Sequence, residues 1–179
     1  MKVSAYMLVY NHEKYLRDAL EGVVNQQTDF AFEVFVHDDA STDGEQEGIR
    51  KFMAEEIELS DTSFAYETET EYAYIQYAQH KTNKSCFMVA MFLKENHYSQ
   101  KKKKFPYLAE WRDGVKYEAI CEGDDYWCDK NKLQMQYDAL ETNQTAVFCV
   151  HNVKCISEDG MDLKYSYPKY VIKNKVICI

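Results

Sequence analysis

The sequence lacks the features that mark secreted and membrane-spanning proteins. An apolar segment, Val3–Val9, lies near the start, but Asn11 and Glu13 follow it too soon for the apolar core of a signal peptide. No apolar run approaches the ~20 residues that a membrane-spanning helix needs. We therefore expect a cytoplasmic protein.

The six cysteines do not follow a pattern that binds zinc. No C-x-x-C pair occurs, and the spacing between cysteines and histidines does not match a zinc site. Most of the cysteines lie within apolar runs, which is typical of buried free thiols in a reducing compartment.

Several widespread ligand-binding motifs are also missing. There is neither a G-x-G-x-x-G nor a G-x-x-x-x-G-K-[ST] sequence, so neither a Rossmann dinucleotide site nor a P-loop is supported. No H-E-x-x-H or nucleophile elbow occurs. The net charge of −9 argues against a general nucleic-acid binder. Lysines 101–104 are a local exception, for which a solvated loop is favoured over a phosphate or membrane patch.

What is present suits one globular domain over residues 1–179, with 46% apolar residues and no internal repeat or linker. The unbroken apolar run Val3–Val9 predicts a buried central strand. Apolar residues at helical spacing over residues 15–24 predict a helix packed on the sheet, with Asn11 as its N-cap.

A second strand and helix are predicted next. Alternating apolar residues over 30–36 predict a strand, and the polar turn 37–44 follows it. Thr42 and Glu45 are spaced as a capping box for a helix that reaches about residue 56. Strand, helix, strand and helix imply a parallel βαβ start, hence a three-layer α/β/α sandwich around a mostly parallel sheet.

The rest of the chain extends this pattern. We expect, in order, an irregular insertion at 58–84, a strand at Cys86–Leu93, a polar loop at 94–106, a strand at 117–121, a helix capped by Asp129, a strand at 146–150 and a hairpin from 153 onward. Ligands of parallel α/β sheets bind beyond the carboxyl ends of the strands, so the residues there should converge on one crevice.

An acidic cluster follows the strand predicted at 117–121. Glu122, Asp124 and Asp125 crowd into four positions, and like charges so close repel unless a cation compensates. Mg²⁺ or Mn²⁺ binds one or two carboxylates together with substrate phosphates. Gly123 would let the backbone turn tightly. Taken alone, an ordinary acidic turn explains the cluster equally well.

Polar residues end the other strands as well. Asp38 and Asp39 taken alone are typical of a turn cap, and Tyr10 is typical of packing. His37 and His151 also lie near predicted strand ends, where a lone histidine is usually structural.

In combination, these motifs resemble family two glycosyltransferases of the GT-A fold. The resemblance is carried by VSAYMLVYNHEKYLRDAL, FEVFVHDDASTDG and YEAICEGDDYWCDKNKLQMQYDALE. The segments ENHYSQKKKK and VFCVHNV are similar to a bacterial branch with an E-G-D-D-Y-W motif. The resemblance implies a GT-A-like nucleotide-binding domain.

The resemblance also implies roles for individual residues. Tyr10 would stack on or flank the nucleotide base, with Asn11 beside it. Asp39 would accept a hydrogen bond from the base, with Asp38 next to it. Asp124 would lie near the ribose and diphosphate.

The implied metal is Mn²⁺ or Mg²⁺, held by Asp125 with support from Glu122. It would neutralise charge on the leaving diphosphate as the glycosidic bond breaks. The implied reaction is inverting transfer of sugar from a nucleotide-sugar, probably UDP-linked, to a glycan or other hydroxyl acceptor. Bacterial polysaccharide biosynthesis is the implied setting, which leaves room for peripheral contact with the inner face of the membrane.

Family members continue past the strand that matches VFCVHNV into an acceptor-binding segment with a carboxylate base. We therefore expect the acceptor part of this chain to be short or missing, and donor binding without efficient transfer. No carboxylate after Asp125 is placed to act as the base, and His151 is the other candidate.

Two alternatives stay open. A nucleotidyltransferase uses a similar fold and metal, but it usually carries a Gly-rich basic phosphate loop near the first strand, and none occurs here. A non-catalytic interaction domain on a glycosyltransferase-like scaffold would bind no nucleotide in a metal-dependent way.

Overall fold

The computed structural model describes residues 1–103, 105–157, 160, 161 and 163. The chain divides into two compact units, Met1–Leu133 and Gln134–Ile179. The first unit contains β1 (Val3–Val9), α1 (Glu13–Val24), β2 (Phe32–Asp38), α2 (Glu45–Glu56), β3 (Tyr66–Glu69), β4 (Ala73–Gln79), β5 (Cys86–Leu93), α3 (Phe105–Arg112) and β6 (Tyr117–Glu122). A further helix, α4 (Lys132–Thr142), begins at the end of that unit. Within the described residues no helix is long and apolar enough to cross a bilayer.

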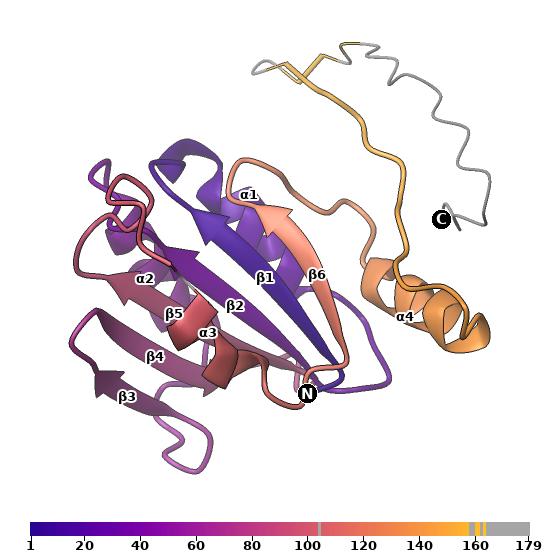
Figure 1. Ribbon diagram of the computed structural model, residues 1–179, viewed down its shortest axis with the longest axis horizontal. Coiled ribbons are helices and arrows are strands. Elements are labelled where there is room, and N and C mark those ends of the chain that lie inside the picture. Colours follow the sequence, from indigo (N-terminus) through magenta and orange to yellow (C-terminus); the bar gives the residue numbers. More distant parts are fainter. Residues whose placement is uncertain (104, 158–159, 162, 164–179) are drawn as a thin grey trace. The chain divides into compact units, whose positions relative to one another are not determined.

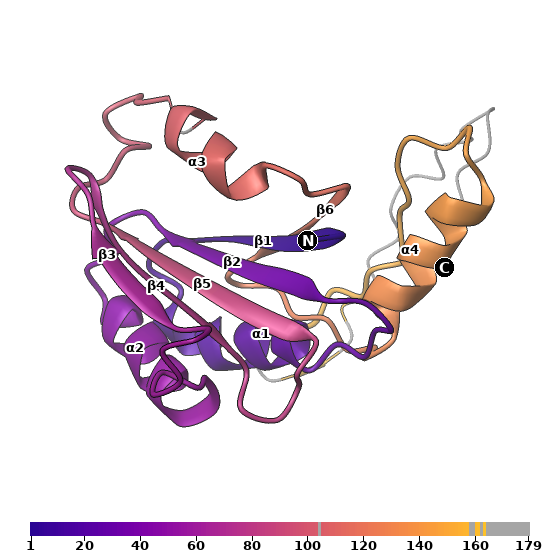
Figure 2. The same ribbon diagram turned by 90° about the horizontal axis from the view of Figure 1, so that it is seen from below.

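The six strands form one sheet in the order β3-β4-β5-β2-β1-β6 (Figure 1). β1 pairs in parallel with β2 and β6, and β2 pairs in parallel with β5, whereas β3 and β4 add an antiparallel edge. Helices α1 and α2 cover one face of the sheet, and α3 lies on the other (Figure 2). The predicted three-layer α/β/α fold with a mostly parallel sheet is therefore confirmed.

One face of the sheet packs on the apolar stripe of α1. Leu16, Leu20 and Val23 are fully or almost fully buried there, as their helical spacing predicts. Burying a side chain of this size stabilises the fold by about 1.5–3 kcal/mol. Packing on the sheet therefore holds α1 in place.

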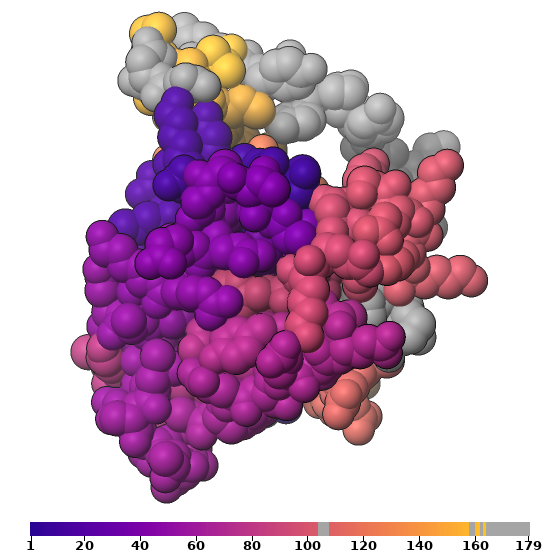
Figure 3. Space-filling model, turned by 90° about the vertical axis from the view of Figure 1, so that its left-hand side faces the viewer, coloured from indigo at the N-terminus to yellow at the C-terminus, as the bar shows by residue number. Residues whose placement is uncertain are grey.

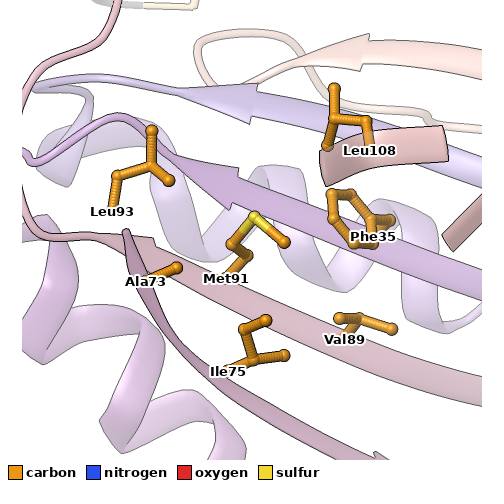
Figure 4. Packing of buried hydrophobic residues seen from close by; sticks show 7 residues of the cluster. All are labelled: Phe35, Ala73, Ile75, Val89, Met91, Leu93 and Leu108. Carbon is orange, nitrogen blue, oxygen red and sulfur yellow. The ribbon is translucent and has the colours of Figure 1, made fainter. Parts of the chain in front are cut away.

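The opposite face carries a second apolar cluster, shown in Figure 4. It includes Phe35 of β2, which lies below Leu108 of α3. The Phe35 ring is also 5.8 Å from that of Trp111, between centroids. The other members come from β4 and β5: Ala73, Ile75, Val89, Met91 and Leu93. These contacts fix α3 to the sheet.

Residues 58–84 are not the irregular insertion that we expected. They contain the antiparallel hairpin of β3 and β4, whose register pairs Tyr66 with Tyr77. The two rings stack with centroids 5.2 Å apart. Buried and half-buried residues follow one another along Ala73–Gln79 without a strict alternation, so the sequence does not show the period of a strand.

Three further boundaries differ from prediction. The second strand begins and ends two residues later than the predicted 30–36, and α3 begins inside the predicted loop 94–106.

In the second unit the predicted strand 146–150 is reduced to an isolated bridge residue, Val150. The hairpin predicted from 153 survives as a turn, in which the Ser157 amide donates to the Met161 carbonyl at 2.8 Å. Residues 158, 159 and 162 lie outside the described residues.

The described cysteines are all free thiols, but they are not all buried as expected. Cys86 and Cys121 are buried, whereas Cys128 is exposed and Cys149 and Cys155 are partly exposed. Their positions in apolar runs therefore predicted burial correctly only inside the sheet.

A packing contact between α1 and the segment after β6 gives a test of the fold. A Cβ atom added at Gly22 would lie 2.8 Å from the backbone nitrogen and oxygen of Trp127. Overpacking against backbone costs about 1–3 kcal/mol. The gain of about 1 kcal/mol in helix propensity offsets part of that cost, so we expect Gly22→Ala to lower the free energy of unfolding by up to about 2 kcal/mol, measured by urea denaturation.

Gly48→Ala in α2 is the matched control. Its Cβ would meet only the Leu16 Cδ2 atom, the end of a flexible side chain, at 2.8 Å. The gain of about 1 kcal/mol in helix propensity should offset that contact. Equal destabilisation by both substitutions would contradict the packing described here.

A buried acid lies on the α3 side of the sheet. Glu33 is 6% exposed, and its carboxylate accepts a hydrogen bond from Ser4 Oγ at 3.0 Å. Burial raises the pKa of Glu33 from 4.5 to about 7, and the hydrogen bond opposes this only in part. The folded protein thus holds this proton more tightly than the unfolded chain, so the contribution of Glu33 to stability is lost as the pH rises from 4.5 to about 7.

Replacing Glu33 tests this linkage. Glu33→Gln keeps an acceptor for Ser4 and removes the ionisation, so it should raise the free energy of unfolding at pH 8 by about 1–3 kcal/mol and change it little at pH 4.5. Urea denaturation at both pH values measures the difference. Glu67→Gln is the control: Glu67 is exposed and its pKa is lowered by hydrogen bonds from Tyr74 and Gln76, so the sign should reverse. A Glu33→Gln gain independent of pH would refute the linkage.

Candidate active site at the carboxyl edge of the sheet

Three parallel strands end together at one edge of the sheet. β1, β2 and β6 end at Val9, Asp38 and Glu122, and the register pairs Leu8 with both His37 and Glu122. The backbone continues the alignment beyond the strands, because the Asp39 amide donates to the Val9 carbonyl at 3.1 Å. The Gly123 amide likewise donates to the Leu8 carbonyl at 3.1 Å. The segments predicted to converge on one crevice therefore do lie at one edge.

Asp38 organises the turn that follows β2. Its carboxylate accepts hydrogen bonds from the Ala40 amide at 3.1 Å, from the Ser41 amide at 3.2 Å and from the Gln46 side chain. These bonds hold Ala40 at a φ of 61°, a left-handed conformation that a non-glycine residue rarely adopts. Asp38 is fully buried, and burial raises the pKa of its carboxyl group.

Asn11 links the segment after β1 to the same turn. Its side-chain oxygen accepts a hydrogen bond from the Thr42 amide at 2.8 Å, and its own amide donates to Ser41 Oγ at 3.0 Å. Asn11 has a φ of 59°, and the residue at the N-cap of α1 is His12. The predicted N-cap role of Asn11 is therefore wrong, because its side chain is used between segments and not within its own helix.

Asp43 caps two helices with one carboxylate. Oδ2 accepts a hydrogen bond from the Glu13 amide at the start of α1, and Oδ1 accepts one from the Glu45 amide at the start of α2, both at 3.0 Å. The first amides of a helix have no partner within it, and a negative charge there also interacts favourably with the helix dipole. One side chain thus fixes two helix starts relative to each other.

The predicted capping box of Thr42 and Glu45 does not form. α2 starts after Gly44, which has a φ of 107° and no capping side chain. The buried Glu45 carboxylate instead accepts hydrogen bonds from Ser41 Oγ at 2.7 Å and from the His12 amide at 3.3 Å. Burial raises the pKa of Glu45, and the nearby carboxylates add to the shift.

Asp39 is buried against the loop that follows β5. Its Oδ1 accepts a hydrogen bond from the His97 amide at 2.8 Å, and its Oδ2 accepts one from the Tyr98 amide at 3.0 Å. Its carbonyl oxygen accepts a third from Asn96 Nδ2 at 3.1 Å. Because Asp39 is 2% exposed and Asp38 is not exposed at all, neither carboxylate is available to a nucleotide in this conformation. The contact roles predicted for both stay predictions.

The loop after β5 is the part of this edge that sequence reasoning did not place. It was expected only as polar and lysine-rich, yet its backbone joins the turn after β2. Figure 3 shows the two segments side by side on the surface. The signal was the segment ENHYSQKKKK, which carried part of the family resemblance.

The acidic turn after β6 is exposed, unlike the acids after β2. Glu122, Asp124 and Asp125 all lie on the surface, and the Asp125 amide closes the turn on the Glu122 carbonyl at 3.1 Å. Tyr10 at the end of β1 is 43% exposed. The predicted contact residues that a ligand can reach here are therefore Tyr10, Asn11, Asp124 and Asp125, together with Glu122.

Gly123 lets this turn approach the segment after β1. A Cβ atom there would lie 2.7 Å from His12 Nδ1 and 2.7 Å from Val9 Cγ1, so no larger residue fits without a shift. Burial raises the pKa of the neighbouring Cys121 thiol to about 12, and the negative charges of the turn contribute. The thiol is thus a packed neutral group beneath the acidic turn.

The carboxylates at this edge suit a metal ion that is held jointly by the protein and a bound phosphate, and not one that is enclosed by protein ligands alone. Across the described part of the chain, no three His, Cys, Asp or Glu side chains are grouped to hold a metal. Exposed carboxylates such as Asp125 and Glu122 match the chemistry of Mg²⁺ or Mn²⁺, which takes one or two protein ligands plus phosphate oxygens. The residues therefore fit a metal that binds together with a diphosphate.

Neither histidine singled out earlier gains a catalytic role. His37 is fully buried, and its Nδ1 lies 2.7 Å from the hydroxyl oxygen of Tyr6. His151 belongs to the second unit, where it is exposed and its Nδ1 lies 2.9 Å from the Asn152 carbonyl oxygen. His151 therefore stays an untested candidate for the base.

Comparison with known proteins agrees with this geometry. Residues 4–71 match the model of a family described as glycosyl transferase family 2. The match covers β1, β2 and the turn with Asp38 and Asp39, but it ends before Glu122. This match supports the predicted resemblance of the chain to glycosyl transferase family 2.

Relatives and solved structures extend the comparison. The proteins Rv1520 of Mycobacterium tuberculosis (strain H37Rv) and Mb1547 of Mycobacterium bovis are each 30% identical over 158 residues, which cover 88% of this chain and 37% of each relative. Staphylococcus aureus TarS 1-349 in complex with UDP shares the fold, with a TM-score of 0.59 and 18% identity over 90% of this chain and 38% of TarS. The complex with UDP-GlcNAc gives a TM-score of 0.56 and 20% identity over 90% and 37%. This chain thus spans little more than a third of the length of these proteins.

The shared cap provides a test of how the site is built. Asp43→Ala removes acceptors from the starts of both α1 and α2, and losing one such cap costs about 0.5–2 kcal/mol. We expect the free energy of unfolding to fall by about 1–3 kcal/mol, measured in urea.

Asp18→Ala is the control for Asp43→Ala. Asp18 is exposed within α1, so the substitution should be neutral or slightly stabilising through helix propensity. If both variants unfolded at the same urea concentration, Asp43 would not join the two helices.

Proposed function

We propose that this chain is the donor-binding part of a family 2 glycosyltransferase that binds a UDP-linked sugar at the carboxyl edge of its sheet. The observation that carries the proposal is the meeting of the exposed acidic turn Glu122–Asp125 with Tyr10 where the parallel strands end. Ligands of parallel α/β sheets bind at this edge. The family match of residues 4–71 and the fold shared with the UDP complexes of TarS support the same reading.

Each exposed residue has a defined task in this proposal. Tyr10 flanks the base, because its ring is exposed at the end of β1. Asp124 faces the ribose and diphosphate, and Asp125 with Glu122 holds Mn²⁺ or Mg²⁺. Such a cation, when bound, supplies positive charge to the diphosphate as it departs.

Other residues at this edge serve by positioning. Asn11 and Asp43 hold the segment after β1 against the turn after β2, so the backbone at this edge is fixed before any ligand binds. Gly123 brings the acidic turn close to the same segment. Pre-organisation of this kind lowers the entropy lost on binding.

The proposed reaction is an inverting transfer to a glycan or other hydroxyl acceptor in bacterial polysaccharide biosynthesis. An acceptor oxygen attacks the anomeric carbon, its proton passes to a base, and the bond to the nucleoside diphosphate breaks. The chain spans 37% of the length of its curated relatives. The complete reaction is therefore proposed for a protein of their full length.

Ligand-dependent stability tests the proposal. UDP with Mn²⁺ should raise the melting temperature more than either alone, because ligand at 100 times its dissociation constant stabilises by about 2.7 kcal/mol. Asp125→Asn keeps the size and removes the charge, so it should abolish the metal-dependent part of the shift. Thermal denaturation measures both.

Asp113→Asn is the control, an identical chemical change on an exposed residue before β6, at the opposite end of that strand. It should keep the wild-type shift. The absence of a shift with any nucleotide and metal would leave the non-catalytic interaction domain as the better account. Unfolding of Asp125→Asn would instead mark Asp125 as a structural cap.

A further inference from the structure

A single buried side-chain amide joins the end of α1 to the start of α4. Gln26 is 0% exposed. Its Nε2 atom donates to the carbonyl oxygens of Gly22 at 3.0 Å and of Asp129 at 2.8 Å, and its Oε1 atom accepts a hydrogen bond from the Leu133 amide at 2.9 Å. The last carbonyls of one helix and the first amides of another have no partners within their own helices, and this one side chain serves both.

The chain before Leu133 contacts the end of α1 at two further points. A Cβ atom added at Gly22 would lie 2.8 Å from the backbone nitrogen and oxygen of Trp127, so the two backbones approach closely. The Gln27 amide donates to the Lys130 carbonyl at 2.7 Å. We call residues 127–133 the α1-bound segment, because these contacts hold it against that helix.

The α1-bound segment begins two residues after Asp125. On the other side, the acidic turn is fixed to the sheet, because the Gly123 amide donates to the Leu8 carbonyl at 3.1 Å. Residues 124–126 between these two fixed points are exposed, whereas Gly123 and Trp127 are buried. The position of Asp125 therefore depends on where the α1-bound segment is held.

We propose that Gln26 is a positioning residue for the metal site: its amide holds the α1-bound segment so that Asp125 and Glu122 meet the cation and the diphosphate together. This inference rests on the proposed donor-binding function. Gln26 is buried and acts only through the segment. Groups that support metal ligands from behind in this way set the geometry in which those ligands bind.

UDP affinity with and without Mn²⁺ separates positioning from general stability. Gln26→Met keeps the length of the side chain and removes all three hydrogen bonds. With Mn²⁺ present, the dissociation constant of UDP should rise by about tenfold, the lower end of what the loss of a supporting group costs at metal sites. Without metal it should equal the wild-type value, because Asn11 is held by the turn after β2 and not by this segment. Calorimetric titration of the folded variant measures both constants.

Gln27→Met is the matched control. It makes the same chemical change on the next residue, whose side chain is exposed and whose backbone bond to Lys130 remains. It should bind UDP as the wild type does, with and without Mn²⁺. Hydrogen exchange at the Leu133 amide should quicken by about tenfold in Gln26→Met, the scale of one lost hydrogen bond, and stay unchanged in Gln27→Met.

Gly22→Ala keeps the test decisive if Gln26→Met does not fold. Its Cβ atom would displace the backbone at Trp127, so it should weaken UDP binding only when Mn²⁺ is present.

The outcomes are distinct. Wild-type affinity in Gln26→Met with Mn²⁺, or an equal loss with and without the metal, overturns the role of Gln26. If Gln26→Met cannot be measured, unchanged Mn²⁺-dependent binding in Gly22→Ala overturns it. A wild-type protein whose UDP binding does not depend on Mn²⁺ would instead refute the proposed metal site, and the role of Gln26 with it. Exchange at Leu133, which needs no ligand, would still show whether Gln26 holds the segment.

Discussion

The carboxyl edge of the sheet depends on one constraint: the first amides of α1 and α2 need acceptors at the same place. The turn between β2 and α2 supplies them, because Asp43 accepts from the amides of Glu13 and Glu45. Asn11 adds a bond in the opposite direction, because its side-chain oxygen in the segment after β1 accepts from the Thr42 amide. The first amides of a helix have no acceptor within the helix, so these reciprocal bonds fix the geometry of the edge.

Much of the sheet could be predicted from the sequence, because its parallel strands are apolar runs without an alternative structure. The run Cys86–Leu93 became β5 with the predicted bounds. The antiparallel edge was missed, since Tyr66 of β3 is exposed, the tyrosines of β4 are only half buried, and both strands lie among acids. α3 was missed because it packs through Leu108 and Trp111 on the sheet, a contact that no local pattern reveals.

The site was predictable in position but not in the division of tasks. Four aspartates at strand ends are equivalent in sequence, yet Asp38 and Asp39 are buried while Asp124 and Asp125 are exposed. The difference arises from tertiary partners, above all the amides of the loop after β5. An acid that meets backbone amides becomes part of the scaffold, whereas one on an open turn stays available to a cation or diphosphate.

The most direct test of this account is to map which backbone amides gain protection from hydrogen exchange when UDP and Mn²⁺ are added. Protection should gather at Tyr10, at residues 96–98 and at residues 122–125, the three segments that meet at the carboxyl edge of the sheet. No protection at these segments, or protection centred on Glu33 and Glu118 toward the amino ends of the strands, would contradict it.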